Sequence, residues 1–410
     1  MSTVGVNDGL TPEFLIAAGR VIDGHRDVPV LYDGAAAVAG LRIVAVGMRR
    51  ELADRFPRIP VIDMPNGSLM PGLIDCHVHL TMPGDGSNYE IGAGASIAQR
   101  HRRATANARR HLLAGVTTVR DLGSHADLFE WRADAGGEMP RLLLYGPALT
   151  RPDGHMHLFG GTCSGAPDVA ARAGQNLVLG SDGIKIVASG GTTLGTQPHE
   201  ASFSVEELAA AAGVAHGAGK LITAHALPIE AMRRSLDAGL DGIEHLAFLH
   251  GPGRSEFDEE VAARIVRQGV TLGSTIGVNS RYVSLAQQDE VSDYELDEQR
   301  QRTAYYLANA ARLHAMGARL VAASDAGWKY TRFGEFAVEL QLLAGAGLSP
   351  REVIHAATAG AAEYLRLADV GRVAPGFQAD LLLVAGDPLS EIEAFGDVQA
   401  VYRAGRRVGA

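Results

Sequence analysis

His77 and His79 stand one residue apart at the end of a short apolar run, residues 73–79, that directly follows a Pro71-Gly72 turn. On a β-strand the side chains of residues i and i+2 point to the same side, so the two imidazoles can converge on one metal ion. Two histidines on one strand face are also often mere polar packing. The pair alone therefore leaves both interpretations open, and the rest of the sequence has to decide between them.

Three further residues that could bind a metal lie at the ends of other short runs of β-branched and apolar residues. His225 ends one run, His245 follows Glu244 in the next, and Asp325 ends the last of these runs. In a barrel of parallel strands the functional side chains gather at the carboxyl ends of the strands, so we expect these residues to meet the first pair. Three histidine positions and one carboxylate make an adequate set for a single zinc ion.

Lys185 lies between apolar neighbours in the run 183–189, which predicts a fully buried parallel strand. An unpaired ammonium group is costly in such a place. Burial can lower the pKa of the amine and leave a neutral nucleophile that adds carbon dioxide, and the resulting carbamate can bridge two metals. Alternatively, the lysine pairs with a carboxylate such as Asp182 or extends to the barrel mouth. The other strands that end in potential ligands favour the carbamate.

A scaffold of alternating strands and helices is needed to bring these residues together. From residue 73 onward, short apolar runs alternate with longer helical patterns, and several runs follow a glycine-containing helix stop. The eight runs span residues 73–79, 116–121, 142–145, 183–189, 221–225, 242–246, 270–275 and 320–325. They predict an α/β fold, a (β/α)8 TIM barrel over residues 71–370, and the segment 292–316 is predicted to be one long helix.

The two ends of the chain follow a different pattern of short alternating strands and turns. Residues 1–70 and 371–410 are each too small to bury a good core separately. We therefore expect them to pair into one small β-sandwich domain beside the barrel.

The composition, 46% hydrophobic and 20% charged, is typical of a globular enzyme. A net charge of -10 argues against nucleic-acid and membrane partners, which call for a basic surface. Two cysteines cannot form a disulfide framework, no apolar run approaches about 18 residues, and the N-terminus lacks a signal-peptide pattern. We expect a cytoplasmic protein, and a homo-oligomer is left open.

Together these motifs resemble the binuclear metal-dependent enzymes of the amidohydrolase superfamily. The resemblance extends over nearly the whole chain, through residues 70–79, Lys185 with Gly190-Gly191, His225, Glu244-His245, Ser324-Asp325 and residues 374–381. It implies two divalent metal ions, zinc foremost, with carbon dioxide required for carboxylation of the lysine. The ligands that it implies are His77, His79 and Asp325 for one metal, His225 and His245 for the second, and carboxylated Lys185 as the bridge.

The resemblance also implies a mechanism in which a hydroxide that bridges the metals attacks the carbonyl carbon of the substrate. Asp325 would take the proton of the hydroxide and return it to the leaving amine. The loop after the third strand resembles the Gly-His-rich loop of the dipeptidase-like branch. We expect His155, with His157 in reserve, to help polarise the scissile carbonyl, the alternative being that both are ordinary polar loop residues.

The loops around residues 189–208 resemble the same branch, which includes Xaa-Pro and Xaa-Arg dipeptidases and ochratoxinase-like amidases. The expected substrate is therefore a small amide, either a dipeptide or an N-acyl amino acid. A free carboxylate on this substrate would need a cationic clamp. Arg281, beside Tyr282, is the first candidate, and Lys329 and Arg332 compete with it.

Leu227 stands where members of this branch often carry tyrosine or histidine, two residues after the fifth-strand histidine. This departure favours a larger or more apolar acyl group, in contact with Trp328, Tyr330 and Phe159.

Other functions remain as alternatives. One is hydrolysis of another C-N bond or of an ester or lactone. Another is deamination of a heterocycle by a mononuclear enzyme, which would have no use for Lys185 and usually carries a glutamate where this chain has Pro228. A catalytically inactive scaffold protein typically loses ligands, whereas this sequence retains all of them.

Overall fold

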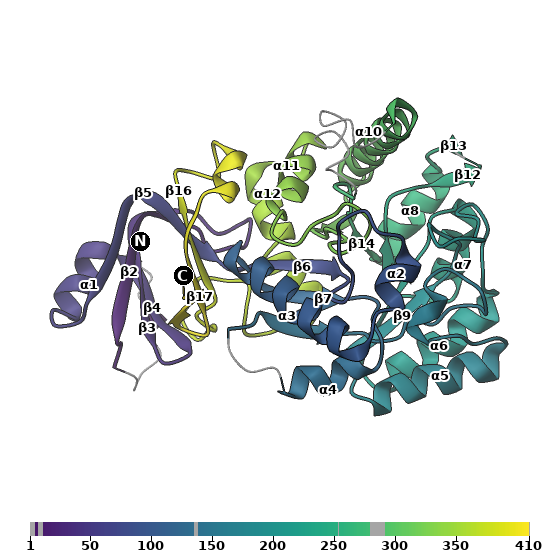
Figure 1. Ribbon diagram of the computed structural model, residues 1–410. Coiled ribbons are helices and arrows are strands. Elements are labelled where there is room, and N and C mark those ends of the chain that lie inside the picture. The colour runs from purple at the N-terminus through teal and green to yellow at the C-terminus, as the bar shows by residue number, and fades with distance from the viewer. Residues whose placement is uncertain (1–4, 7–10, 135–137, 253, 279–291, 410) are drawn as a thin grey trace.

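The computed structural model describes residues 5–6, 11–134, 138–252, 254–278 and 292–409. It confirms the α/β class. A sheet built from the two ends of the chain lies on the left of Figure 1, and a larger body of parallel strands and helices lies on the right. The candidate ligands belong to the larger body.

The sheet of the chain ends has eight strands in the order β1-β4-β3-β2-β5-β16-β17-β18. Its strands are β1 (Gly5–Val6), β2 (Phe14–Val21), β3 (Leu31–Ala39), β4 (Arg42–Met48), β5 (Val61–Pro71), β16 (Leu381–Ala385), β17 (Val398–Arg403) and β18 (Arg406–Arg407). The two ends meet where β5 pairs antiparallel with β16. The pairing describes one continuous sheet, so the expected β-sandwich of two packed layers is not shown.

The strands of the larger body pair in parallel in two sheets. The first sheet is β6 (Leu73–Val78), β7 (Val116–Asp121) and β8 (Arg141–Leu144). The second is β9 (Gly183–Val187), β10 (Leu221–His225), β11 (Gly242–Glu244), β14 (Thr271–Gly273) and β15 (Arg319–Val321), and neighbours in both sheets follow chain order. Isolated parallel bridges, Leu149 to Ile186 and Val78 to Ala326, link the two sheets at both edges. The eight expected runs are thus all strands, although this pairing does not itself show one continuous barrel.

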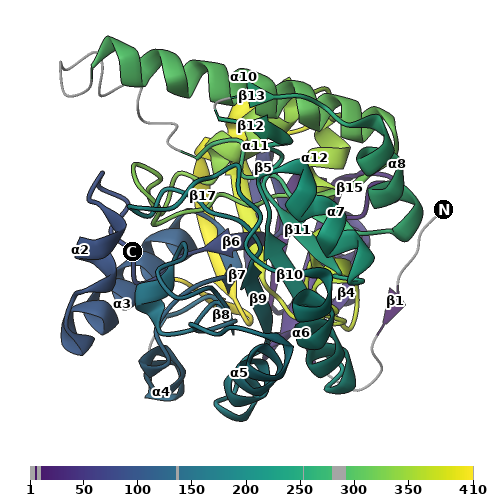
Figure 2. The same cartoon turned by 90° about the vertical axis from the view of Figure 1, so that its right-hand side faces the viewer.

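Helices lie around the strands, as Figure 2 shows, and α10 extends across one side of the strand bundle. Serine capping boxes begin α3, α6 and α12, where each serine side chain and a residue three positions later satisfy free backbone N-H groups. The helices are α1 (Arg49–Arg55), α2 (Tyr89–Ala93), α3 (Ile97–Leu113), α4 (Asp127–Asp134), α5 (Ala166–Val178), α6 (Val205–Gly217), α7 (Ile229–Asp237), α8 (Glu259–Gln268), α10 (Asp293–Ala315), α11 (Ala337–Gly345), α12 (Pro350–Ala356) and α13 (Ala359–Tyr364).

Strands β11, β14 and β15 end before the sequence pattern predicts. Each stops where the backbone leaves the extended conformation, and soon afterwards φ becomes positive at His245 (76°), Thr275 (44°) and Asp325 (60°). Residues other than glycine rarely adopt this left-handed conformation, and it concentrates at functional sites. At these three positions the backbone turns away from the strand direction. The apolar runs of the sequence continue through the turns, so the runs are longer than the regular strands.

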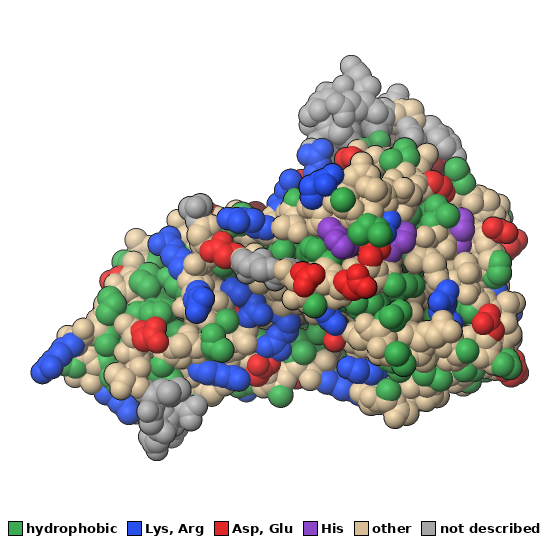
Figure 3. Space-filling model, turned by 60° about the horizontal axis from the view of Figure 1, so that its bottom comes forward, with side chains coloured by type: hydrophobic (Ala, Val, Ile, Leu, Met, Phe, Trp, Pro, Cys, Tyr) green, Lys and Arg blue, Asp and Glu red, His purple; other side chains and the backbone are tan. Residues whose placement is uncertain are grey.

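Both cysteines, Cys76 and Cys163, are buried and free. Basic and acidic side chains are interspersed on the face shown in Figure 3. Within the described part of the chain, no helix combines the length and the apolar character that crossing a bilayer requires.

Candidate metal centre and active site

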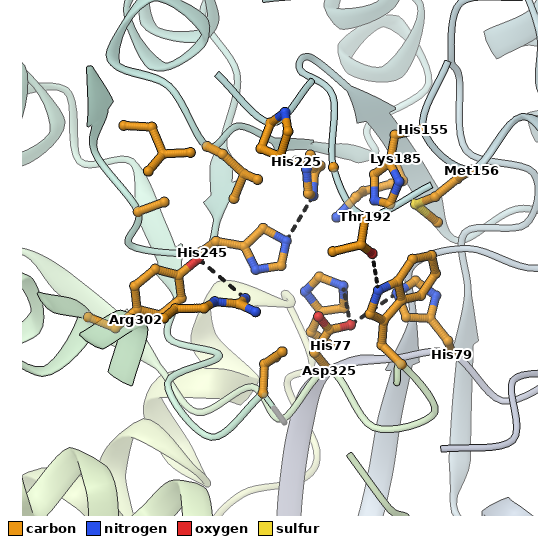
Figure 4. A pocket seen from close by; sticks show the side chains of 18 of the residues that line it. His77, His79, His155, Met156, Lys185, Thr192, His225, His245, Arg302 and Asp325 are labelled. Atoms are coloured by element: carbon orange, nitrogen blue, oxygen red, sulfur yellow. Dashed lines mark hydrogen bonds and ion pairs between the residues drawn. The ribbon is translucent and has the colours of Figure 1, made fainter. Parts of the chain in front are cut away.

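Six side chains converge on one cavity of about 230 Å³ at the carboxyl ends of the parallel strands (Figure 4). They come from five different strand ends, and each is buried. They are His77 and His79 at the end of β6, Lys185 on β9, His225 at the end of β10, His245 after β11 and Asp325 after β15. The structure thus brings together all six residues that the sequence nominates as metal ligands.

Asp325 lies between the two histidines of β6. Its Oδ1 atom is 3.5 Å from His77 Nε2 and 3.2 Å from His79 Nε2. This oxygen is buried but has no hydrogen-bond partner within the described part of the chain. His77, His245 and Asp325 offer ligand atoms that all lie within 4.8 Å of one another, an arrangement that can hold a metal ion.

The outer nitrogen of each β6 histidine has a fixed partner. His77 Nδ1 lies 3.0 Å from Glu244 Oε2, and His79 Nδ1 lies 3.1 Å from the carbonyl oxygen of Gly123. Both partners are acceptors, so Nδ1 donates its proton and Nε2 presents a lone pair to the cavity. Gly123 allows this approach, because a Cβ atom there would lie 2.1 Å from Met156 Cε and 3.1 Å from His79 Cε1.

His225 and His245 form a second pair, with His225 Nδ1 2.9 Å from His245 Nε2. His225 Nε2 donates to the carbonyl oxygen of Gly190 at 3.1 Å, and His245 Nδ1 is 2.8 Å from Thr275 Oγ1. With Nε2 protonated, His225 presents a lone pair on Nδ1. His225 Nδ1 and His245 Nε2 therefore need either a shared proton or a cation between them. A metal ion that accepts both lone pairs meets this need.

The Lys185 ammonium nitrogen is buried and has no hydrogen-bond partner among the residues that the structure describes. Burial lowers its pKa to about 8, although Glu244 and Asp325 act in the opposite direction. Asp182, the alternative partner considered from the sequence, instead contacts Arg132 and accepts a hydrogen bond from the Leu144 N-H at 2.8 Å. Lys185 therefore remains free to react or to contact a ligand.

Three of the four candidate ligand histidines favour the neutral form in this setting. Burial lowers the pKa of His77, His225 and His245 well below the ordinary value, and the nearby Lys185 lowers all three further. For Asp325, burial acts to raise the pKa, but the interactions with His77, His79 and Lys185 outweigh it and the net pKa is lowered. Neutral imidazoles and an ionised carboxylate are the forms that bind metals. The donor set therefore fits divalent cations.

Arg120 and Glu244 form a buried ion pair next to the candidate ligand His77. Glu244 Oε1 accepts hydrogen bonds from Arg120 Nη2 and Thr223 Oγ1, both at 2.7 Å, while Oε2 contacts His77. Arg120 is fully buried and its guanidinium lies 5.5 Å and 5.0 Å from the ring centres of Tyr145 and Tyr364. Sequence reasoning missed this arginine, although it stands in an apolar strand run just as Lys185 does.

Two further carboxylates hold the strand ends in place. Asp75 accepts hydrogen bonds from the backbone N-H groups of His77 (3.1 Å) and Ser324 (3.0 Å), which ties β6 to the segment after β15. Glu339 on α11 accepts from the Ile276 N-H (3.1 Å) and the Gly277 N-H (2.6 Å), just after Thr275. Burial raises the pKa of Glu339 to about 7, although these hydrogen bonds act to lower it.

Among the expected substrate residues, His155, Leu227 and Trp328 line the cavity. The His155 ring centre lies 4.7 Å from that of His225 and 5.2 Å from that of Trp328. Thr193 Oγ1 accepts the Met156 N-H at 3.2 Å and lies 2.8 Å from His155 Nδ1. The threonine hydroxyl can thus donate to Nδ1 and leave the proton of His155 on Nε2.

The other expected substrate residues lie elsewhere. His157 is outside the cavity lining, and its Nδ1 donates to the carbonyl oxygen of Gly154 at 2.9 Å. Lys329 Nζ donates a hydrogen bond to Asn88 Oδ1 at 3.2 Å. Arg332 is exposed and does not line the cavity. Arg281 and Tyr282 lie outside the described residues.

Helix α10 supplies cavity residues that sequence reasoning missed, namely Arg302, Tyr305 and Tyr306. Their spacing of three and four residues places them on one helix face. That spacing is visible in the sequence, but it does not tell which face of the helix meets the cavity. The other cavity residues are apolar in the main and include Pro198, Ala247, Leu249 and Val278.

Comparison with known proteins agrees with this geometry. The sequence profile of the amidohydrolase family matches residues 68–408. An ochratoxinase of Aspergillus niger is 25% identical, over 94% of this chain and 84% of that protein. An imidazolonepropionase of Salinispora tropica is 26% identical, over 88% of this chain and 86% of that protein.

Among solved structures, a Xaa-Pro dipeptidase with methionine bound in its active site shares the fold, with a TM-score of 0.82. It is 24% identical, and the alignment covers 97% of this chain and 100% of that one. Because the family profile spans most of the sequence, from β5 to the end of the last strand, the chain belongs to the amidohydrolase family.

Proposed function

We propose that this chain is a metal-dependent amide hydrolase that cleaves a dipeptide or an N-acyl amino acid. The observation that carries the proposal is the convergence of six buried potential ligands on one cavity, where Lys185 Nζ and Asp325 Oδ1 have no hydrogen-bond partner in the described ranges of the chain. Membership of the amidohydrolase family and the similarity to an ochratoxinase support this class of reaction.

His77, His79 and Asp325 would hold one divalent metal, and His225 and His245 would hold the second, with zinc the leading candidate for both. When bound, such ions lower the pKa of water and polarise a carbonyl group. The three β6 and β15 ligands are grouped around Asp325 Oδ1, whereas His225 and His245 face each other. This grouping supports two neighbouring sites.

Lys185 would bridge the two sites as a carbamate. Its neutral amine donates an electron pair to the carbon of carbon dioxide, an N-C bond forms as one C-O π bond breaks, and the nitrogen then loses a proton to water. The product is an anion with two oxygen donors in place of one ammonium group. A pKa of about 8 keeps an appreciable fraction of the amine neutral near physiological pH.

Asp325 and His155 would act on the substrate. The Asp325 carboxylate takes a proton from the attacking water and later delivers it to the leaving amine nitrogen. His155, protonated on Nε2 through its contact with Thr193, donates a hydrogen bond to the carbonyl oxygen as negative charge develops there. Both side chains are nearly closed off from bulk solvent, at 5% and 4% exposure, which strengthens these interactions.

The test is to purify the full chain without chelator, to measure its metal content and to assay release of free amino acids from a panel of dipeptides and N-acyl amino acids. We expect about two divalent ions per chain and amide hydrolysis that a chelator abolishes and zinc restores. One ion per chain, with activity on heterocyclic amines instead of amides, would contradict the proposal and favour deamination.

A pair of histidine variants tests the role of the cavity side chain. His155→Ala should lower kcat by about 10²- to 10³-fold, as loss of a hydrogen-bond donor to a developing oxyanion does. His250→Ala, at an exposed position of the short strand β12 (Leu249–Gly251), is the matched control and should leave kcat unchanged. Equal activity of the two variants would exclude His155 from the reaction.

A further inference from the structure

One wall of the cavity carries a cation that the proposed metal chemistry does not use. Arg302 lies on α10, and its guanidinium is 5.1 Å from the centre of the Tyr306 ring and 3.5 Å, Nη2 to Oη, from the Tyr306 hydroxyl. Figure 4 shows this side chain extending toward His77, His245 and Asp325. Tyr305, one residue earlier on the same face, also lines the cavity.

Arg302 is not neutralised within the part of the chain that the structure describes. Tyr306 is its one polar contact there, and no described carboxylate forms an ion pair with it. Arg120 shows the contrast, because Glu244 compensates that buried cation at 2.7 Å. A partly buried cation without a carboxylate is unfavourable unless an anion from outside pairs with it.

The position of Arg302 is fixed by two buried amides on the same helix. Gln299 Nε2 donates to the carbonyl oxygen of Val278 at 2.7 Å, and Asn309 Nδ2 donates to that of Leu246 at 2.7 Å. These residues stand three positions before and seven positions after Arg302, which places all three on one face of α10. The helix is thereby tied to the segments that follow β14 and β11, which places the cation at the cavity wall.

The cation also lies close to the groups that would handle the leaving amine. Burial acts to lower the pKa of Arg302, but Tyr306, Tyr305 and then Asp325 outweigh it and raise the pKa, so the side chain stays charged. Arg302 in turn helps to lower the pKa of His245. An α-amino acid carries its amine and its carboxylate on one carbon atom. A substrate whose amine leaves near Asp325 therefore places its carboxylate within reach of a neighbouring cation.

The remaining cavity wall is apolar and suits the acyl side of such a substrate. It includes Leu227, Ala247, Leu249, Val278 and Trp328. Resting on the hydrolase activity proposed above, we propose that Arg302, flanked by Tyr305 and Tyr306, binds the α-carboxylate of the amino acid that leaves. The preferred substrates are then N-acyl amino acids with a free carboxylate and an apolar acyl group. Arg302 takes the role for which sequence reasoning nominated Arg281.

The experiment compares two substrates that differ only in this charge, N-acetyl-L-phenylalanine and N-acetyl-L-phenylalaninamide. Metal-loaded full chains of the wild type, Arg302→Met and Arg300→Met are assayed for release of the acetyl group. Arg300, on the same helix with a side chain 61% exposed and Asp297 at 3.5 Å, is the matched control. Circular dichroism and metal content establish that each variant is folded and loaded.

We expect the wild type to prefer the free acid. Arg302→Met should raise KM for the acid by about 10- to 100-fold, the effect of losing a charged hydrogen bond, with little change for the carboxamide. Arg300→Met should behave as the wild type does, and Arg302→Lys should recover part of the preference because it restores a cation. Equal effects of Arg302→Met on acid and carboxamide would overturn the inference.

A binding measurement separates this inference from the hydrolase proposal. If the wild type hydrolyses neither compound nor any member of the wider panel, the hydrolase proposal fails. Calorimetry with L-phenylalanine and L-phenylalaninamide then decides on the carboxylate site by itself. Binding of the acid that Arg302→Met weakens at least 10-fold supports the site, and the same affinity in both proteins, or no binding to the wild type, overturns it.

Discussion

Replacing Arg120 by methionine removes the cation that pairs with Glu244, the carboxylate in contact with the candidate ligand His77. Methionine retains much of the length and apolar contact of the side chain between Tyr145 and Tyr364. It loses the hydrogen bonds from Nη2 to Glu244 (2.7 Å) and from Nε to the Cys76 carbonyl (2.6 Å). The carboxylate of Glu244, 1% exposed, then stays buried beside Thr223 and His77 without a compensating cation.

The size of the effect follows from this burial. Removing one partner of a buried ion pair costs about 3–5 kcal/mol, because the other charge remains out of water. Globular domains are stable by only about 5–15 kcal/mol, so the variant loses a large part of its free energy of unfolding. The exposed pair Arg50 and Asp54, with side chains 92% and 77% exposed, provides the control. Arg50→Met should cost less than about 0.5 kcal/mol.

The assay is urea unfolding followed by circular dichroism, with chelator present so that metal binding adds nothing to the measured stability. A double-mutant cycle with Glu244→Gln isolates the interaction between the two side chains. We expect a coupling energy well above about 1 kcal/mol between Arg120 and Glu244. If Arg120→Met falls within about 1 kcal/mol of Arg50→Met, the assignment of this pair as a structural requirement is wrong.

Three further predictions concern the same region. Lys185→Ala should abolish hydrolysis and reduce the metal content, with partial rescue by acetate; full activity of the variant would rule out the bridging carbamate. Glu339 has a folded-state pKa of about 7 against an ordinary value of 4.5, so the folded state binds the extra proton. The protonated Glu339 side chain therefore stabilises the folded state fully below about pH 4.5. This contribution to the free energy of unfolding, about 3 kcal/mol, is lost as the pH rises through 7. Unfolding measured at several pH values should show this slope in the wild type, and a Glu339→Gln variant that keeps the slope would refute its origin. Gly273→Ala should destabilise the chain and weaken metal binding, because a Cβ atom there would lie 2.1 Å from Glu244 Oε2; unchanged metal affinity by titration would contradict this.

The candidate ligands could be predicted from the sequence because each ends an apolar strand run, and parallel strands present their ends on one side of the sheet. Lys185 could be singled out because burying an unpaired ammonium group in such a run is energetically costly. The same argument applies to Arg120, whose role depends on a carboxylate far along the chain. Spacing along the sequence cannot pair Arg120 with Glu244 without knowledge of which strands lie opposite each other.

Arg302 could not be predicted for a different reason. A helical pattern over residues 292–316 predicts α10, but the face that meets the cavity depends on the contacts of Gln299 and Asn309 with distant loop carbonyls. The chain ends show a related difficulty. Alternation predicts strands there, but only the structure shows that β5 pairs with β2 on one side and with β16 on the other. One sheet thus forms from segments that, by sequence alone, suit a sandwich equally well.

The pairing of β5 with β16 has a consequence for the order in which the molecule can be made. β5 ends at Pro71, and β6 with its two histidines begins at Leu73, so only Gly72 separates them. During synthesis one edge of β5 waits without its partner until residues 381–385 leave the ribosome, more than 300 residues later. Strand β6 pairs with β7 soon after it is synthesised, whereas β5, directly before it, is made early and gains its second neighbour only near the end of synthesis. Slow closure and exposure of an unpaired strand edge are the expected hazards of folding for this enzyme.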